Sequence, residues 1–247
     1  MINELLFMVV ILLSNIIQGI TGFAGTILAM PFSLRLVGMD VAVPVLNMLG
    51  VLSGIYVLLG NYRYVNLREL FKILAVMGPS LGIGLIVKKI LLNDAGMLYL
   101  LLGIIVLAIS IKGLLGLYLE YTGRSLSFNR NGVFQNLVLV ISGIVHGMYV
   151  CGGPFLIAYL AQRIDRKEEF RATISTVWIF LNGIIFVSQI VNGMWNSNNL
   201  RIQFISIPPL IIGMFIGSVL SKQMSQRFFM VLTYVLLFVA GVSLFFK

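Results

Sequence analysis

The sequence predicts an all-α polytopic membrane protein made of two homologous halves, with inverted repeats favoured, each starting with a glycine-broken helical hairpin. The composition, the long apolar segments and an internal similarity predict this fold class. Of the 247 residues, 60% are hydrophobic and 10% are charged, whereas soluble domains typically contain ~45–50% and ~25%. The mean hydropathy is +1.05. These values exclude a soluble globular protein.

Apolar segments recur along the whole chain, and most have the ~20 residues that a membrane-spanning helix needs. They cover residues 5–34, 41–59, 71–87, 97–119, 133–160, 173–191, 204–220 and 228–246. The first segment has no basic residues before it, follows Glu4 and leads into further membrane segments. We therefore expect a retained helix there, not a cleaved signal peptide.

An internal similarity divides the chain into two halves. Residues 16–25, with the sequence IIQGITGFAG, align without a gap with residues 144–153, with the sequence IVHGMYVCGG. This register places Gln18 on His146 and Gly25 on Gly153. We predict a first membrane repeat at residues 1–122 and a second at residues 123–247, within one integral membrane domain.

Two small-residue motifs also match between the halves. Gly78-x-x-x-Gly82 falls on Gly213-x-x-x-Gly217 when small gaps are allowed. Such motifs let helix backbones approach closely in membranes. We expect packing seams at both places, which serve intramolecular packing or a homodimer equally well.

Each half opens with a segment too long for one upright helix. As a single helix, residues 2–37 would be ~54 Å long, against a hydrocarbon core of ~30 Å. A kink would give four crossings per half, with both halves pointing the same way. A hairpin would give an odd number of crossings and an inverted second half.

The positive charges favour the hairpin, because Lys and Arg in short loops prefer the cytoplasmic side. The kink interpretation divides the seventeen Lys and Arg residues eight against nine, and the hairpin interpretation divides them twelve against five. The hairpin places both termini outside the cytoplasm.

The breaks are the predicted sites. A helix that starts after Gly25 or Gly153 has first N–H groups without an intrahelical partner and a partial positive charge. Pro154 suits the first helical position, where its missing N–H is no loss. Two such termini from opposite halves would form a polar pocket that selects anions.

The candidate substrate-binding residues lie at the breaks or carry polar groups in apolar segments near them. His146 serves as a donor or proton carrier, or is a neutral histidine bonded within the bundle. Arg171 is more simply a cytoplasmic anchor, or the partner of Glu168 in a loop salt bridge, than a group that neutralises an anion on its path. The full candidate set is Gln18, Thr21, Gly22, Gly25, Thr26, Asn47, His146, Cys151, Gly152, Gly153, Pro154, Thr173, Ser175, Thr176 and Asn182.

Several function classes are not supported. The basic residues that give the net charge of +9 are scattered through short loops, which orients a membrane protein and does not indicate nucleic-acid binding. The single cysteine excludes an internal disulfide, and no Cys or His spacing indicates a metal or cofactor. No Gly-x-Ser-x-Gly or His-Glu-x-x-His motif is present, so we expect no enzyme.

Three stretches carry a family resemblance: Gln18-Gly-Ile-Thr-Gly-Phe-Ala-Gly25 with Pro31, Tyr62-Arg-Tyr-Val-Asn-Leu-Arg-Glu69, and Gly147-Met-Tyr-Val-Cys-Gly-Gly-Pro-Phe-Leu156 followed by Lys167-Glu-Glu-Phe-Arg-Ala-Thr173. In this order, over nearly the whole chain, they resemble the TauE/SafE family of sulfite exporters. The resemblance implies transport of sulfur-containing anions such as sulfite or organosulfonates in the bacterial inner membrane. The segment Phe23-Ala-Gly-Thr26, where a run of glycines is common, and Cys151 depart from the pattern and leave the anion open.

We therefore expect a secondary transporter that works by alternating access and holds its anion at the helix N-termini after Gly25 and Gly153. A small-anion channel, a transporter of an unrelated anion and an assembly subunit without flux are the alternatives. The expected partners are the small anion and membrane lipid, with no nucleic acid and with a homodimer as an option.

Overall fold

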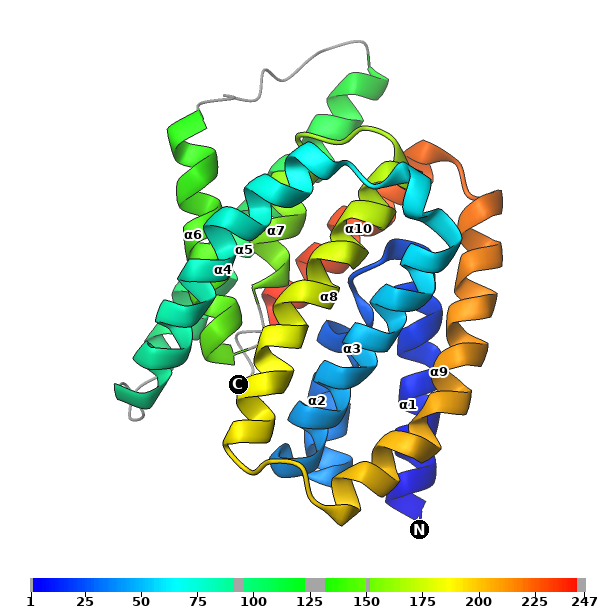
Figure 1. Cartoon of the computed structure of the whole chain (residues 1–247). Helices are drawn as coiled ribbons and strands as arrows, with labels where there is room; N and C mark the ends of the chain where they lie inside the picture. Colours follow the sequence, from blue (N-terminus) through cyan, green and yellow to red (C-terminus); the bar gives the residue numbers. More distant parts are fainter. Residues whose placement is uncertain (1, 91–95, 123–131, 150–151, 244–247) are drawn as a thin grey trace. The chain divides into compact units, whose positions relative to one another are not determined.

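In the computed structural model, residues 2–90, 96–122, 132–149 and 152–243 are described, and this part of the chain is about 90% helical and contains no strand. Figure 1 shows the arrangement of the helices. They are α1 (Ile2–Thr21), α2 (Gly25–Val37), α3 (Met39–Asn61), the 3₁₀ turn η1 (Tyr62–Tyr64), α4 (Leu67–Ile90), α5 (Gly96–Tyr121), α6 (Gly132–Tyr149), α7 (Gly153–Leu160), α8 (Lys167–Val191), α9 (Ser197–Gln223) and α10 (Gln226–Ser243).

Five helical segments of the described chain are long and apolar enough to cross a membrane: Ile2–Thr21, Met39–Tyr64, Leu67–Val87, Lys167–Val191 and Ser197–Gln223. Large apolar side chains are exposed along them, as Phe204 and Phe215 on α9 illustrate. Apolar side chains on the outer faces of the helices suit contact with lipid. The predicted all-α, multi-pass membrane fold is confirmed.

The chain breaks where the glycines predict a break. The α1 helix ends at Thr21 and α2 begins at Gly25, and in the second half α7 begins at Gly153. Pro154 is the second residue of α7, one place later than expected but still in the first turn, where no N–H is needed. Gly22 has a φ of 85°, a left-handed conformation that favours glycine.

The first break is the tip of a hairpin. A Cβ built on Gly25 would lie 2.7 Å from Gln18 Cβ and 3.1 Å from the Ser14 carbonyl oxygen, so α2 turns back alongside α1. Figure 1 shows α1 rising from the N-terminus and α2 running back beside it. The 13 residues of α2 span only ~20 Å as a helix. The α2 helix is therefore too short to cross the bilayer by itself.

The contacts divide the chain into two compact units. Unit 1 comprises Met1–Leu74 and Glu168–Met224, and unit 2 comprises Ala75–Lys167 and Ser225–Lys247. Each unit therefore combines helices from both halves of the sequence. These units are defined by contacts within the chain, whereas the two repeats were predicted from sequence similarity. The repeat boundary between residues 122 and 123 therefore stays a prediction.

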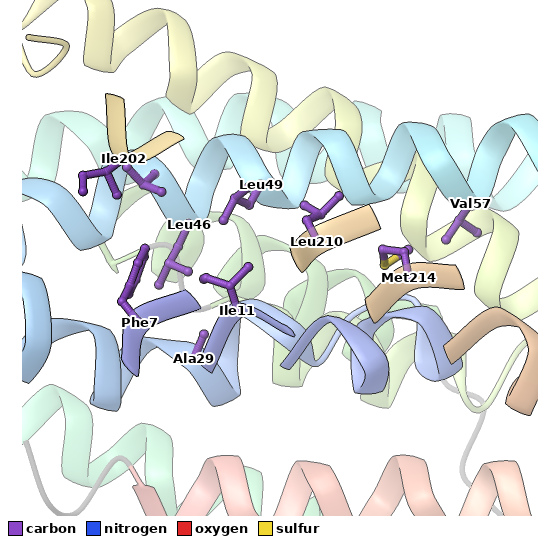
Figure 2. Packing of buried hydrophobic residues seen from close by; sticks show 10 residues of the cluster. Phe7, Ile11, Ala29, Leu46, Leu49, Val57, Ile202, Leu210 and Met214 are labelled. Atoms are coloured by element: carbon purple, nitrogen blue, oxygen red, sulfur yellow. The ribbon is translucent and has the colours of Figure 1, made fainter. Parts of the chain in front are cut away.

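Unit 1 has a core between α1, α2, α3 and α9. The buried cluster includes Phe7 and Ile11 of α1, Leu46 of α3 and Met214 of α9, and none of the four is more than 2% exposed. In Figure 2 the cluster extends along the helices, with Phe7 and Leu46 at one end and Met214 near Val57 at the other. Lipid is as apolar as these side chains, so close packing and not the hydrophobic effect holds such helices together.

A glycine seam joins α1 to α9 in unit 1, and Figure 1 shows the two helices running side by side. A Cβ built on Gly19 would lie 2.8 Å from the Met214 carbonyl oxygen and 3.0 Å from Gly217 Cα. Gly213 lies against Leu12 and Asn15 in the same way. The predicted seam at Gly213 and Gly217 is present.

Unit 2 has a corresponding seam, but not at the predicted glycines. A Cβ on Gly84 of α4 would collide with the Ile144 carbonyl oxygen of α6, and one on Gly147 would collide with that of Leu81. In the described part of the chain, Gly78 and Gly82 have nothing within 4 Å of a built Cβ. The intramolecular seam expected at these two glycines is absent from the described residues, because the face of α4 that carries Gly84 is the one that packs against α6. A homodimer contact at Gly78 and Gly82 stays a prediction.

Candidate functional site

A small polar cavity lies beside the first break, within unit 1. Its lining comes from α1, α2 and α3: Ser14, Asn15, Gln18, Gly25, Thr26, Ala29, Leu46, Leu49, Gly50 and Ser53. Its volume is about 10 Å³, counted as the space open to the centre of a water molecule. That is about the space that one water needs. None of the ten lining residues is acidic.

Gln18 organises the break. Its Oε1 accepts a hydrogen bond of 2.7 Å from the Gly25 N–H, and its Nε2 donates to Ser53 Oγ over 3.1 Å and to the Gly22 carbonyl over 3.4 Å. Gln18 is only 3% exposed. One side chain thus ties the turn to both α2 and α3, as the sequence position near the break predicts.

Thr21 and Gln18 satisfy the first amides of the turn. Thr21 Oγ1 accepts from the N–H groups of Phe23 and Ala24 over 3.4 and 3.3 Å. These two side chains therefore cap three of the amides that have no partner within their own helix.

Two amides of the first turn of α2 remain available. Among the described residues, the N–H groups of Thr26 and Ile27 have no hydrogen-bond acceptor, and the first backbone bond of the helix is from Leu28 to the Ala24 carbonyl. Thr26 also lines the cavity. The positive end of α2 therefore presents free donors next to a polar cavity, which is an arrangement suited to a small anion.

The α8 helix approaches the break from outside the cavity lining. Ser175 Oγ donates to the Gly22 carbonyl over 3.3 Å. A Cβ on Gly22 would lie 2.8 Å from Ser175 Oγ and 3.1 Å from the Arg171 carbonyl oxygen. Phe170 packs edge-to-face on Phe23, with ring centroids 6.2 Å apart. The turn is thus enclosed by α8, which explains why a glycine is needed at Gly22.

Arg171 differs from its sequence-based expectation. It is only 5% exposed, and its Nη2 donates to Ser218 Oγ of α9 over 2.6 Å. A cytoplasmic anchor would keep its guanidinium in water, whereas this group lies inside unit 1, where Glu168 is near enough to interact with it electrostatically.

Asn47 and Asn182 lie together on the other side of the cavity wall. Asn47 Nδ2 donates to the Asn182 carbonyl over 3.1 Å and to Gln189 Oε1 over 3.3 Å. A Cβ on Gly50, which lines the cavity, would lie 2.8 Å from Asn182 Nδ2. The pair thus supports the wall and joins α3 to α8.

Two predicted residues have structural partners instead. Thr173 Oγ1 accepts a 2.9 Å hydrogen bond from the Asn66 N–H, just before α4. Thr176 Oγ1 donates to the Ala172 carbonyl of its own helix over 2.8 Å. Neither residue lines the cavity.

The second break, within unit 2, repeats part of this geometry. Ser142 Oγ donates to the Gly152 carbonyl over 2.8 Å. A Cβ on Gly152 would lie 2.7 Å from His146 Cβ and collide with the Ser142 carbonyl oxygen. His146 is 3% exposed. Gly152 thus meets His146 much as Gly25 meets Gln18, while Cys151 lies outside the described residues.

The structure therefore gathers five of the predicted residues at the first break, namely Gln18, Thr21, Gly22, Gly25 and Thr26, with Ser175 in contact. Ser14 and Arg171 are additions to the candidate set. Ser14 lies one helical turn before Gln18, so the helical period alone would have placed it on the same face. No comparable signal in the sequence showed that Arg171 is buried.

Comparison with known proteins gives one clear relationship. The model of the family described as sulfite exporter TauE/SafE matches residues 6–244. Neither the curated proteins nor the solved structures give a significant match. The match extends over nearly the whole chain and includes both breaks. The chain belongs to the TauE/SafE sulfite exporter family, whose members are membrane transporters and not enzymes.

Proposed function

We propose that the chain moves sulfite or a related small sulfur-containing organic anion across the bacterial cytoplasmic membrane by alternating access. The anion is held at the N-terminus of α2, within unit 1, and the expectation from the sequence that the N-terminus of α7 also holds it stays a prediction. The observation that carries the proposal is the cavity beside the first break, where the free Thr26 and Ile27 amides begin α2 and no acidic residue lines the wall.

The electrostatics of this cavity favour the binding of an anion. The free amides and the helix dipole present partial positive charge. Gln18 Nε2 and the Ser53 hydroxyl add polar groups on the facing helices. In a membrane interior these fixed dipoles act in a low dielectric, so they interact with an anion more strongly than they would in water.

The cavity as it stands admits about one water molecule, so substrate binding requires a wider state. Gln18 is the residue that must move, because its Oε1 occupies the Gly25 N–H. An anion oxygen can replace Oε1 as the acceptor of that hydrogen bond. The protein thus exchanges an internal hydrogen bond for a substrate bond, as a transporter with an occluded empty state requires.

The test is uptake of radiolabelled sulfite by proteoliposomes that contain the purified chain. Vesicles preloaded with unlabelled sulfite are compared with empty vesicles and with protein-free vesicles. A carrier exchanges substrate, so preloading accelerates uptake. Uptake that preloading does not accelerate indicates a channel, and uptake equal to that of protein-free vesicles refutes sulfite as the substrate.

A glycine variant tests the site itself. Gly25→Ala forces Gln18 out of place, since the new Cβ would lie 2.7 Å from Gln18 Cβ, and we expect uptake to fall by about 10-fold or more while the protein still inserts. Gly60→Ala is the matched control, because the described residues leave open space around Gly60. Equal uptake by both variants would refute the site. We expect the same loss for a bulky residue at Gly152 or Gly153.

The orientation is also part of the proposal. The twelve-to-five division of Lys and Arg supports an orientation with both termini outside the cytoplasm. Reporter fusions at the C-terminus, active only in the cytoplasm or only outside it, test this placement.

A further inference from the structure

Arg171 is a buried cation next to the first break. A Cβ on Gly22 would lie 3.2 Å from Arg171 Cγ, so the side chain runs directly past the turn between α1 and α2. The residue is 5% exposed. The guanidinium is charged at any physiological pH.

The hydrogen bonds of Arg171 are incomplete. Nη2 donates to Ser218 Oγ over 2.6 Å, whereas Nε is buried and has no acceptor among the described residues. An unpaired buried donor costs about 1–3 kcal/mol, and more when it is charged. Glu168, one turn earlier on α8, and Tyr56 on α3 lie close enough to act electrostatically on the guanidinium. Neither occupies Nε–H.

We propose that Arg171 binds the transported anion directly and selects anions that present two oxygens to one guanidinium. This inference rests on the proposed function. Nε–H and the adjacent Nη2–H form a planar fork that matches two oxygens of a sulfite or sulfonate group. When the anion binds, one of its oxygens accepts a hydrogen bond from the unpaired Nε–H. A second oxygen replaces Ser218 Oγ as the acceptor of the Nη2–H hydrogen bond.

The charge balance supports this role. A buried cation in a membrane protein marks a functional position by default, and a bound anion adds negative charge at the Nε–H donor that Glu168 leaves without an acceptor. Chloride is a single atom, so it bridges the two donors only with bent hydrogen bonds, whereas two oxygens of an oxyanion accept two parallel and more linear ones. The site therefore distinguishes a trigonal or tetrahedral oxyanion from a halide.

Three variants and one control test the inference in the purified full chain. Arg171→Gln removes the charge, Arg171→Lys keeps the charge without the fork, and Ser218→Ala removes the present acceptor. Arg68→Gln is the control, because Arg68 is an exposed arginine in the first turn of α4. The readouts are the thermal midpoint and its shift with sulfite, methanesulfonate or chloride, together with the half-saturation of sulfite uptake.

For Arg171→Lys we expect a thermal midpoint near that of the wild type, a half-saturation raised about 10-fold or more, and a smaller preference for the two oxyanions over chloride. Ser218→Ala and Arg68→Gln should keep the half-saturation within about 2-fold of the wild type, on the usual scale of a neutral or surface contact. If Arg171 only tied α8 to α9, Ser218→Ala would behave like Arg171→Gln, and the inference would be overturned.

The failure of the inference is distinguishable from failure of the proposed function. If sulfite and methanesulfonate neither stabilise the wild type nor enter the vesicles, both proposals fall. If they stabilise and enter the wild type, and Arg171→Lys has the same half-saturation and selectivity, only the role of Arg171 is refuted. If Arg171→Gln does not fold, the half-saturation and selectivity of Arg171→Lys alone test the role of Arg171.

Discussion

The seam between α1 and α9 predicts a large effect from one methyl group. In Gly19→Ala the new Cβ would lie 2.8 Å from the Met214 carbonyl oxygen and 3.0 Å from Gly217 Cα. Both neighbours are backbone atoms of a helix, so neither can turn aside as a side chain would. Ordinary contact begins near 3.4 Å, so the helices must separate by about 0.6 Å.

The separation sets the magnitude of the effect. A gap of about 0.5–1 Å forfeits a quarter to a half of each dispersion contact across an interface, and packing is the main force between helices in lipid. Overpacking of this kind costs about 1–3 kcal/mol. We therefore expect Gly19→Ala to lower the free energy of unfolding by that amount.

The assay is unfolding of the purified protein in mixed micelles at increasing mole fractions of a denaturing detergent, followed by circular dichroism. Gly78→Ala is the matched control, since Gly78 lies within α4 and faces open space in the described structure. Alanine is the better helix former by about 1 kcal/mol, so this control should match or exceed the wild type. Equal midpoints for Gly19→Ala and Gly78→Ala would refute the close approach of α1 and α9.

Three further predictions concern the break and its supports. Gln18→Leu leaves the buried Gly25 N–H without its acceptor, so we expect a loss of about 1–3 kcal/mol in the same unfolding assay, and an unchanged midpoint would contradict this hydrogen bond. Gly22→Ala places a side chain at a φ of 85°, with strain of about 1–3 kcal/mol; a wild-type midpoint for this variant would contradict the turn geometry. Thr173→Val removes the acceptor of the Asn66 N–H but touches no cavity residue, so we expect a lower midpoint with unchanged half-saturation, and a changed half-saturation would argue against its structural role.

The sequence determined the membrane class and the places where the chain breaks. Apolar segments of sufficient length must be helical in lipid, because every backbone amide needs an internal partner there. Glycines and a proline within such segments mark the places where the helix is interrupted. The α2 and α7 helices begin at the predicted Gly25 and Gly153. These are local properties, and local chemistry suffices to predict them.

Only the tertiary structure decided which groups surround each break. The capping of Phe23, Ala24 and Gly25 by Thr21 and Gln18 depends on the hairpin geometry, because the order of residues does not tell which side chain reaches which amide. The seam at Gly84, and not at Gly78, depends on which face of α4 meets α6. The burial of Arg171 depends on α3, α8 and α9 enclosing it, and its contact with Ser218 of α9 joins residues 47 positions apart, which no local pattern encodes.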